Sequence, residues 1–444
     1  MKTRLIHGLI IIGIFLFAST YIYAQNVPEI TIKVEGAGTL SKLLGNKYKE
    51  IEKLTLSGDI NASDIGVIRN MTNLISLDLK DTNIKEGGKF TYTRISGGPD
   101  VFHTVTIERK TKDNIIPEEM FYQANCKKLS SVRLPNSAIK IDINAFANEN
   151  DKLSCLKTVE LGDKVETIGG CVFSNCKSLS SVNIPKSVKY IASAAFYGCE
   201  NLESIIIPNG VIQIGGTIDG FYSSGGTFER CKKLRIINIP ASVLFINSGT
   251  FPYCEDLSEI EVDKNNAHYL SEGGFLYTIR KDSIIGYTCG NKRETIYIPN
   301  SVKFIGYNTF TGAKNIKNVY VNNTMPPVLN GSFDSSVKKE GTLYVPKGSY
   351  NNYWLADKWG DFINIIETDI PTSNEIVSHS NEYEIQTISN GILVCTNKPI
   401  NVSIYNIHGQ ILVNKTISGG KVINLPKGIY IVSADNKTHK IIIK

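Results

Sequence analysis

The chain has 444 residues, of which 42% are apolar and 20% are charged, and its formal net charge is +6. This length exceeds one ordinary hydrophobic core, so the chain holds several domains or one repeat array. The composition is that of a folded protein and excludes a disordered chain. The positive charge is spread without a dense Lys/Arg run, whereas a nucleic-acid binder concentrates it on one stripe or helix face. We therefore expect no nucleic-acid partner.

The N-terminus has the pattern of a secretory signal peptide. Lys2 and Arg4 precede an almost unbroken apolar run over residues 9–17, and small residues lead to a cleavage point after Ala24. The run is too short for an ordinary transmembrane span. The first cysteine is Cys126, far from the cleavage point, which disfavours a lipid anchor. We therefore expect residues 1–24 to direct export through the inner membrane, and we expect no transmembrane segment in the mature chain.

An internal repeat fills most of the remaining sequence. Cys176 and Cys199 are 23 residues apart, as are Cys231 and Cys254, and each unit reads C-x-x-L-x-x-V-x-I-P-x-x-V-x-x-I-x-x-x-x-F. V-x-I places two apolar side chains on one face of a short strand, and the proline ends that strand. The V-x-x-I segment that follows the proline, together with the Phe, lines the opposite wall of a coil. One coil cannot bury this apolar set alone, so the pattern predicts stacked coils with a continuous core.

The nine cysteines have two interpretations. In an exported protein such a number suggests disulfides, which neighbouring coils could form. Stacking instead places the repeat cysteines about 5 Å apart as a ladder of small buried side chains. The ladder consists of Cys126, Cys176, Cys199, Cys231 and Cys254, with Leu153 and Ala313 in the same slot of other coils. No histidines accompany the thiols, so we expect no metal site.

These residues carry a resemblance to the BspA-like leucine-rich repeat proteins of Bacteroidetes, over about residues 29–367. Residues 114–135 resemble that family's first repeat, 265–299 its irregular hairpin unit and 324–367 its closing unit. Residues 54–79 resemble its longer opening repeat. The resemblance implies a mostly β, right-handed leucine-rich-repeat solenoid with 23-residue coils. Residues 25–110 would form an N-terminal capping region with the first repeat, and residues 111–367 the solenoid proper.

A different pattern begins after the repeats. Residues 368–382 are polar and turn-rich and predict a linker, whereas residues 383–444 alternate apolar runs with Gly-containing turns. We expect a small C-terminal β-sandwich. The segment is similar to the type A C-terminal sorting domain of the type IX secretion system. The likeness is carried by Gly409, Gln410, Pro426, Gly428, Tyr430, Lys440 and Lys444. It implies a cell-surface or secreted location and contact with that secretion machinery; the alternative is an ordinary terminal β-domain.

A catalytic constellation is not evident in the sequence. Among the six histidines only His103 and His268 fall in the repeat domain, where a Ser–His or Cys–His nucleophile would need one of them. No zinc-protease motif, phosphate-binding loop or CxxC pair occurs. We expect no enzyme, no cofactor and no metal.

Two features are candidates for binding. The position before the second-wall Ile carries Tyr190, Phe245 and Phe304, which form either an aromatic strip for a partner or a shield over the core.

The second feature is a pair of Gly-bounded insertions, which begin at Gly87 and Gly215 and contribute the candidates Tyr92, Arg94, Phe221 and Tyr222. Insertions in repeat arrays often gather on a binding face, although these are equally explained as loop tips without a partner. The resulting hypothesis is a protein that binds extracellular host or bacterial surface proteins and mediates adhesion. A glycan-binding protein and a structural cell-envelope component are the alternatives.

Overall fold

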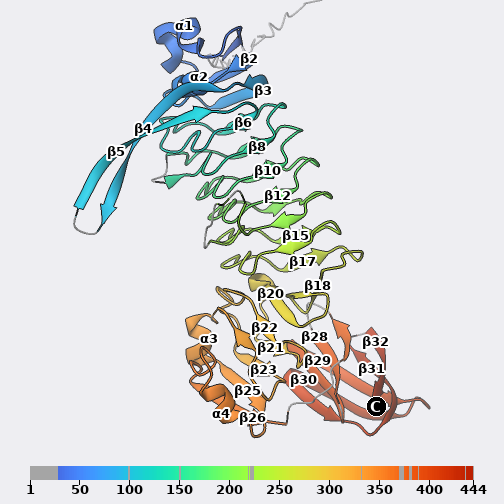
Figure 1. Cartoon of the computed structure of the whole chain (residues 1–444). Helices are drawn as coiled ribbons and strands as arrows, with labels where there is room; N and C mark the ends of the chain where they lie inside the picture. Colours follow the sequence, from blue (N-terminus) through green and yellow to red (C-terminus); the bar gives the residue numbers. More distant parts are fainter. Residues whose placement is uncertain are drawn as a thin grey trace, which may run out of the picture.

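The computed structural model describes residues 29–443, except for residues 99–100, 150–151, 219, 221–224, 332, 370–374, 380–382, 389 and 436. The expected signal peptide and Lys444 lie outside the described residues. Figure 1 shows a long column of stacked coils, a two-stranded hairpin that projects from its N-terminal part, and a C-terminal domain beside its last coils.

One wall of the column is a parallel sheet built from the V-x-I strands. It starts with β1 (Glu29–Val34), β2 (Lys53–Ile60) and β3 (Ser76–Ile84), and continues with β7 (Ser131–Arg133), β9 (Thr158–Glu160) and β11 (Ser181–Asn183). A three-stranded sheet of β13 (Ser204–Ile205), β15 (Ile236–Ile239) and β17 (Glu259–Val262) extends this wall. Val132, Val159 and Val182 pair in register and are buried, whereas Asn183 is exposed. The predicted phase of the repeat is therefore confirmed.

The second wall is a parallel sheet of two-residue strands. Its members are β6 (Ile115–Ile116), β8 (Lys140–Ile141), β10 (Thr167–Ile168), β12 (Tyr190–Ile191), β14 (Gln213–Ile214) and β16 (Phe245–Ile246). The helices α1 (Leu40–Leu44) and α2 (Ala62–Ile68) and the 3-10 helix η1 (Gly45–Lys49) lie at the N-terminal end. Asn61 and Asp64 form a capping box on α2, and Asp64 also accepts from the Leu40 amide, which ties α1 to α2.

Two ladders fill the space between the walls. Six phenylalanines stack from coil to coil with centroids 5.2–6.0 Å apart: Phe121, Phe146, Phe173, Phe196, Phe228 and Phe251. The cysteine ladder is buried, and its thiols are free. Each Sγ donates to a carbonyl of the preceding coil, as Cys199 does to Phe173 at 3.2 Å. Burial raises the pKa of Cys126 to about 12. The cysteines of the ladder are thus packing residues whose thiols contact carbonyl groups in this structure.

The repeat is interrupted after β17 by the irregular hairpin unit, and a second core begins there. The unit contains β18 (Tyr269–Glu272), β19 (Phe275–Thr278), β20 (Ser283–Tyr287) and η3 (Cys289–Asn291). The last coils follow with β21 (Thr295–Ile298), β22 (Phe304–Ile305), β23 (Asn318–Val321), β24 (Val328–Leu329), α3 (Ser335–Glu340), β25 (Thr342–Pro346), α4 (Tyr350–Trp354) and β26 (Asn364–Thr368). Trp359 is buried near this end and donates its indole N–H to the Pro327 carbonyl at 2.8 Å.

The C-terminal segment folds into one six-stranded antiparallel sheet. Its strands are β27 (Glu375–His379), β28 (Tyr383–Ile388), β29 (Gly391–Asn406), β30 (Ile411–Asn424), β31 (Gly428–Ala434) and β32 (Lys437–Ile443). The long β29 pairs with β28 through its first half and with β31 through its second half, and a register shift separates the two. This bend lets one sheet curl and close, where we expected two sheets of a sandwich.

Candidate functional site

The first insertion is an extended β-hairpin. β4 (Gly87–Gly98) and β5 (Val101–Thr111) pair antiparallel and form a sheet of two strands that projects from the column (Figure 1). A two-stranded ribbon is marginally stable in water by itself. The hairpin therefore depends on its attachment to the solenoid.

The base of the hairpin packs on the column through one face. Phe90 and Tyr92 are buried there, and the guanidinium of Arg69 lies over both rings, at 4.6 and 5.1 Å from their centroids. Arg69 follows α2 and is itself buried. Its Nη1 donates to the carbonyls of Glu119 and Met120, at 2.8 and 2.6 Å, and its Nη2 donates to that of Tyr122 at 2.7 Å. One side chain thus joins α2, the hairpin and the first regular coil.

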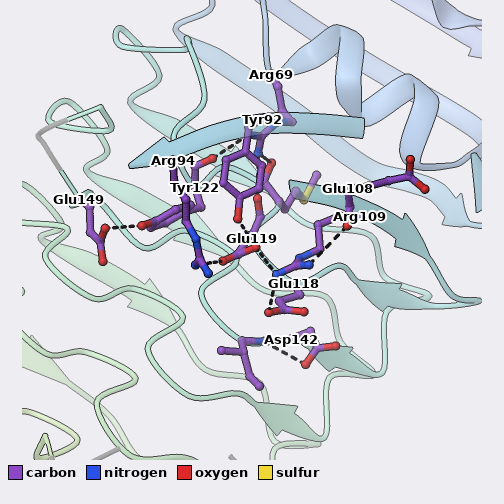
Figure 2. A network of polar contacts seen from close by, with 12 residues as sticks. Arg69, Tyr92, Arg94, Glu108, Arg109, Glu118, Glu119, Tyr122, Asp142 and Glu149 are labelled. Atoms are coloured by element: carbon purple, nitrogen blue, oxygen red, sulfur yellow. Dashed lines mark hydrogen bonds and ion pairs between the residues drawn. The ribbon is translucent and has the colours of Figure 1, made fainter. Parts of the chain in front are cut away.

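Glu119 is the centre of the polar contacts at this base (Figure 2). The Tyr92 hydroxyl donates to its carboxylate, and Arg109 Nη2 lies 2.6 Å from its Oε2. Arg94 Nη1 lies 4.0 Å from its other oxygen. The Glu119 side chain is only 3% exposed, and a buried carboxylate requires polar or charged partners. Groups from both strands of the hairpin supply these partners.

The contacts at the base extend to neighbouring acidic groups. Arg109 Nη2 also bonds Glu118 at 3.0 Å, and the Tyr122 hydroxyl donates to Glu149. Burial, followed by the hydrogen bond to Glu149, raises the pKa of Tyr122 to about 12. Burial lowers the pKa of Arg69 to about 10, and burial with the Glu119 hydrogen bond raises the pKa of Tyr92. The two tyrosine hydroxyls and the Arg69 guanidinium therefore keep their usual protonation states at neutral pH, and their contacts fix the geometry of the hairpin base.

The opposite face of the hairpin is open and rich in threonine. Thr91, Thr93, Thr104 and Thr106 are exposed, and Thr93 pairs directly with Thr106. Within the described residues neither long edge of the ribbon pairs with a third strand. Unpaired edges offer rows of N–H and C=O groups to another chain. The arrangement can therefore bind an extended segment of a partner.

Comparison with known proteins places the repeats in a family. The BspA type leucine rich repeat region matches in six copies over residues 114–225, 222–288 and 283–351, more than half of the chain. The chain belongs to the BspA-type leucine-rich repeat family. No curated protein matches it.

Solved structures of bacterial leucine-rich repeat proteins are similar to this BspA-type chain. One from Eubacterium ventriosum is 19% identical with a TM-score of 0.40, covering 63% of this chain and 79% of its own. A leucine rich cell surface protein from Faecalibacterium prausnitzii is 23% identical with a TM-score of 0.35, covering 52% and 73%. One from Bacteroides ovatus is 22% identical with a TM-score of 0.35, covering 61% and 63%. Family membership rests on the repeat match, because all three TM-scores are below 0.5.

The predicted binding residues of the two insertions have different outcomes. Tyr92 is buried and hydrogen-bonded to Glu119, because the insertion forms strands whose inward positions pack on the column. Its role in ligand binding stays a prediction. Arg94 is half-exposed at the rim of the cluster. Phe221 and Tyr222 lie outside the described residues.

The predicted aromatic strip is not continuous. Tyr190 and Phe245 belong to the second-wall sheet and are separated by Gln213. Phe304 belongs to a different sheet, where it pairs with Ser283 and Val328. The irregular hairpin unit of the BspA-type array separates the two sheets, and it therefore interrupts the predicted strip of aromatic side chains.

The repeat itself contained a signal for Glu119. Glu119 lies two residues before the ladder residue Phe121, and Asn144, Cys171 and Ala194 occupy the same place before the next three ladder residues. All four have a left-handed backbone, with φ between 54° and 59°. The equivalent position in the other coils is Asn, Cys or Ala. A carboxylate at this position therefore indicates a contact that the other coils do not make. Arg69 and Arg109 carried no such signal.

The described residues show neither a metal cluster nor a membrane-spanning helix. His268 is exposed beside Tyr269, and the side chain of His103 is outside the described residues. No group of three or more His, Cys, Asp or Glu residues in the described part of the BspA-type chain is arranged to hold a metal ion. Among the helices described, none combines the length and apolar character that a membrane span requires.

Proposed function

We propose that this BspA-type protein binds other proteins at the cell surface and that the hairpin β4–β5 is its principal binding element. The observation that carries the proposal is the projection of a long two-stranded ribbon, with open edges, from a rigid column (Figure 1). Binding elements held on rigid scaffolds are common, and an exposed strand edge recruits extended peptide segments by main-chain hydrogen bonds.

The base of the hairpin supports a binding role by orienting the ribbon. Arg69 and Glu119 hold both strands against the first coil, so little orientational freedom remains to be lost when a partner binds. The exposed threonines offer hydroxyl groups as donors and acceptors without net charge. Adhesion to extracellular host proteins or to other cells is the biological role proposed for this surface.

A binding screen tests the proposal. The full chain would be immobilised and exposed to extracellular matrix and plasma proteins, with surface plasmon resonance as the readout. A variant in which residues 95–104 are replaced by Asn-Gly shortens the ribbon but keeps Tyr92 and Arg94 at its base. The matched control shortens the second insertion by replacing residues 218–224 with Gly-Gly.

The proposal predicts saturable binding that falls at least about tenfold in the shortened hairpin and is unchanged in the control. Binding lost only in the control variant would move the site to the second insertion. Binding retained by both variants would exclude the hairpin as the principal element.

We also propose that residues 1–24 export the chain and that the C-terminal β-domain directs it to the surface. Several residues of the sorting motif lie in turns. Gly409, with φ 77°, lies in the turn between β29 and β30, Pro426 lies just before β31, and Gly428 is the first residue of β31. Lys440 of β32 pairs with Ile431 of the neighbouring β31. Removal of residues 375–444 should leave the protein inside the outer membrane in cell fractionation. Unchanged surface display would contradict the sorting role.

A further inference from the structure

A partly enclosed cavity of about 250 Å³ lies where the irregular hairpin unit meets the C-terminal domain. Figure 1 shows that domain lying beside the coils of β18 to β23. The cavity is lined from the solenoid side by Phe275, Tyr277, Arg293 and Tyr297, and from β28 by Glu384 and Gln386. The cavity therefore belongs to neither domain alone, and it lies far along the chain from the hairpin β4–β5.

The two domains are joined around this cavity by specific contacts. Tyr297 forms a small apolar cluster with Ile388, Leu393 and Cys395 of the C-terminal domain. The Cys395 thiol donates to the Tyr297 hydroxyl at 2.7 Å. These contacts give the cavity fixed walls, which is a requirement of a preformed ligand site.

The charges of the cavity cancel in pairs. Arg293 Nη1 lies 3.0 Å from Glu384 Oε2, and both side chains are largely buried. At the rim, Lys281 forms an ion pair with Glu272. Two cations and two anions already neutralise each other, so the cavity has no net charge with which to select a charged ligand. Its remaining polar groups can still donate and accept hydrogen bonds.

One buried polar atom of the cavity lacks a hydrogen-bond partner among the described residues. Gln386 is 3% exposed, and its Nε2 donates to Glu384 Oε1 at 2.6 Å, while its Oε1 is buried without a partner. A buried acceptor without a partner costs about 1–3 kcal/mol. Gln386 lines the cavity, and a ligand hydroxyl that donates to this oxygen when the amide turns toward the cavity would recover that cost.

We propose that this cavity binds a single neutral pyranose ring. A sugar ring offers hydroxyl groups that both donate and accept, which matches Gln386 as acceptor and Arg293 as donor. Its C–H faces suit the aromatic walls of Phe275, Tyr277 and Tyr297. Its lack of charge suits a site whose own charges are paired. This site is independent of the protein-binding hairpin, and either proposal can fail without the other.

The full chain would be titrated with methyl α-glucopyranoside, methyl β-galactopyranoside and N-acetylglucosamine, with glutamine as a zwitterionic comparison. Saturation-transfer NMR detects contact, and calorimetry gives Kd. Gln386→Leu removes the free acceptor, and Gln213→Leu in β14 is the matched control at a distance from the cavity. Ser301→Trp places a large ring at the exposed rim of the cavity, so it leaves the core intact.

We expect at least one sugar to bind saturably, with Kd raised about tenfold or more by Gln386→Leu and binding lost in Ser301→Trp. The Gln213→Leu variant and the shortened hairpin should bind like the unaltered chain. The proposal is overturned if no sugar binds, if only glutamine binds, or if a folded Ser301→Trp variant keeps the original Kd.

Discussion

The coils between β7 and β17 and the base of the hairpin β4–β5 are adjacent parts of one solenoid, but different forces hold them. Each coil adds a phenylalanine to one ladder and a cysteine, or Leu153 in one coil, to the other, so neighbouring coils stabilise each other in a similar way. The hairpin base has instead a buried polar cluster, in which Arg69 contacts β4 and the first coil, and Glu119 contacts both strands.

The difference explains what each region can do. Apolar stacking is non-directional and builds a stiff column of arbitrary length. A buried ion cluster is costly to desolvate, but it requires one geometry of its partners. The solenoid therefore provides the scaffold, and the cluster fixes one projecting element at one angle.

The largest effect is expected from a charge placed among the buried side chains of the first wall. Val182→Asp places a carboxylate at a position that is 7% exposed and belongs to the hydrophobic core, next to Val159 on the neighbouring strand. We expect a loss of more than about 4 kcal/mol, with neighbouring coils unfolded. Circular dichroism and urea denaturation measure the loss. Asn183→Asp, on the exposed face next to it, should stay within about 0.5 kcal/mol of the unaltered chain; a normally melting Val182→Asp protein would refute the packing.

The next largest effect is expected at Arg69. Arg69→Met removes the guanidinium donor from the carbonyls of Met120 and Tyr122 and one of the two donors of the Glu119 carbonyl. It also removes the cation above two aromatic rings. We expect a loss of about 3–5 kcal/mol in denaturant unfolding.

Arg133 provides the matched control for this change. It forms ion pairs with Asp78 and Glu160 at 2.8 and 2.9 Å, but its side chain is 40% exposed. Arg133→Met should therefore cost no more than about 1 kcal/mol. Equal losses from the two substitutions would mean that the buried cluster is worth no more than a surface ion pair.

A smaller loss of folding stability is expected at alkaline pH, through the buried thiols of the cysteine ladder. Burial raises the pKa of Cys126 from 9.0 to about 12, so the folded chain holds this proton more tightly than the unfolded chain. The resulting stability is fully present below pH 9 and is lost as pH rises through about 12. Urea midpoints at pH 8 and about pH 10.5 should show a smaller fall for Cys126→Ala than for the unaltered chain. Equal falls would exclude this thiol as a contributor.

The smallest effect is expected in the C-terminal domain. The Tyr430 hydroxyl donates to the Pro426 carbonyl at 2.8 Å and closes the turn before β31. Tyr430→Phe should cost about 1 kcal/mol, confined to that domain. Limited proteolysis would show faster cleavage after residue 390 and an unchanged solenoid, and Tyr405→Phe on β29 serves as the control. Faster cleavage throughout the solenoid would contradict a local role for this bond.

The comparison also shows what sequence can and cannot predict here. The core positions of the coils were predictable because residues such as Val159, Val182 and Phe173 recur at fixed spacing, and such a periodic apolar pattern specifies which side chains face inward. The hairpin base was missed because its contacts join residues about 50 positions apart, such as Arg69 and Glu119, which occur once. The insertion was interpreted as a loop from its glycines, although the alternation of Phe90, Tyr92 and Arg94 is that of a strand with one buried face.

The most direct test of the account is amide hydrogen exchange by mass spectrometry on the unaltered chain and on Glu119→Gln. This substitution keeps the shape of the side chain and removes the charge that Arg109 and Arg94 neutralise. We predict faster exchange in residues 87–94 and 104–111 with unchanged protection in the coils of β7 to β17, because local opening follows the contacts that are lost. Unchanged protection of the hairpin, or faster exchange spread through the coils, would contradict the claim that this buried cluster holds the hairpin in place.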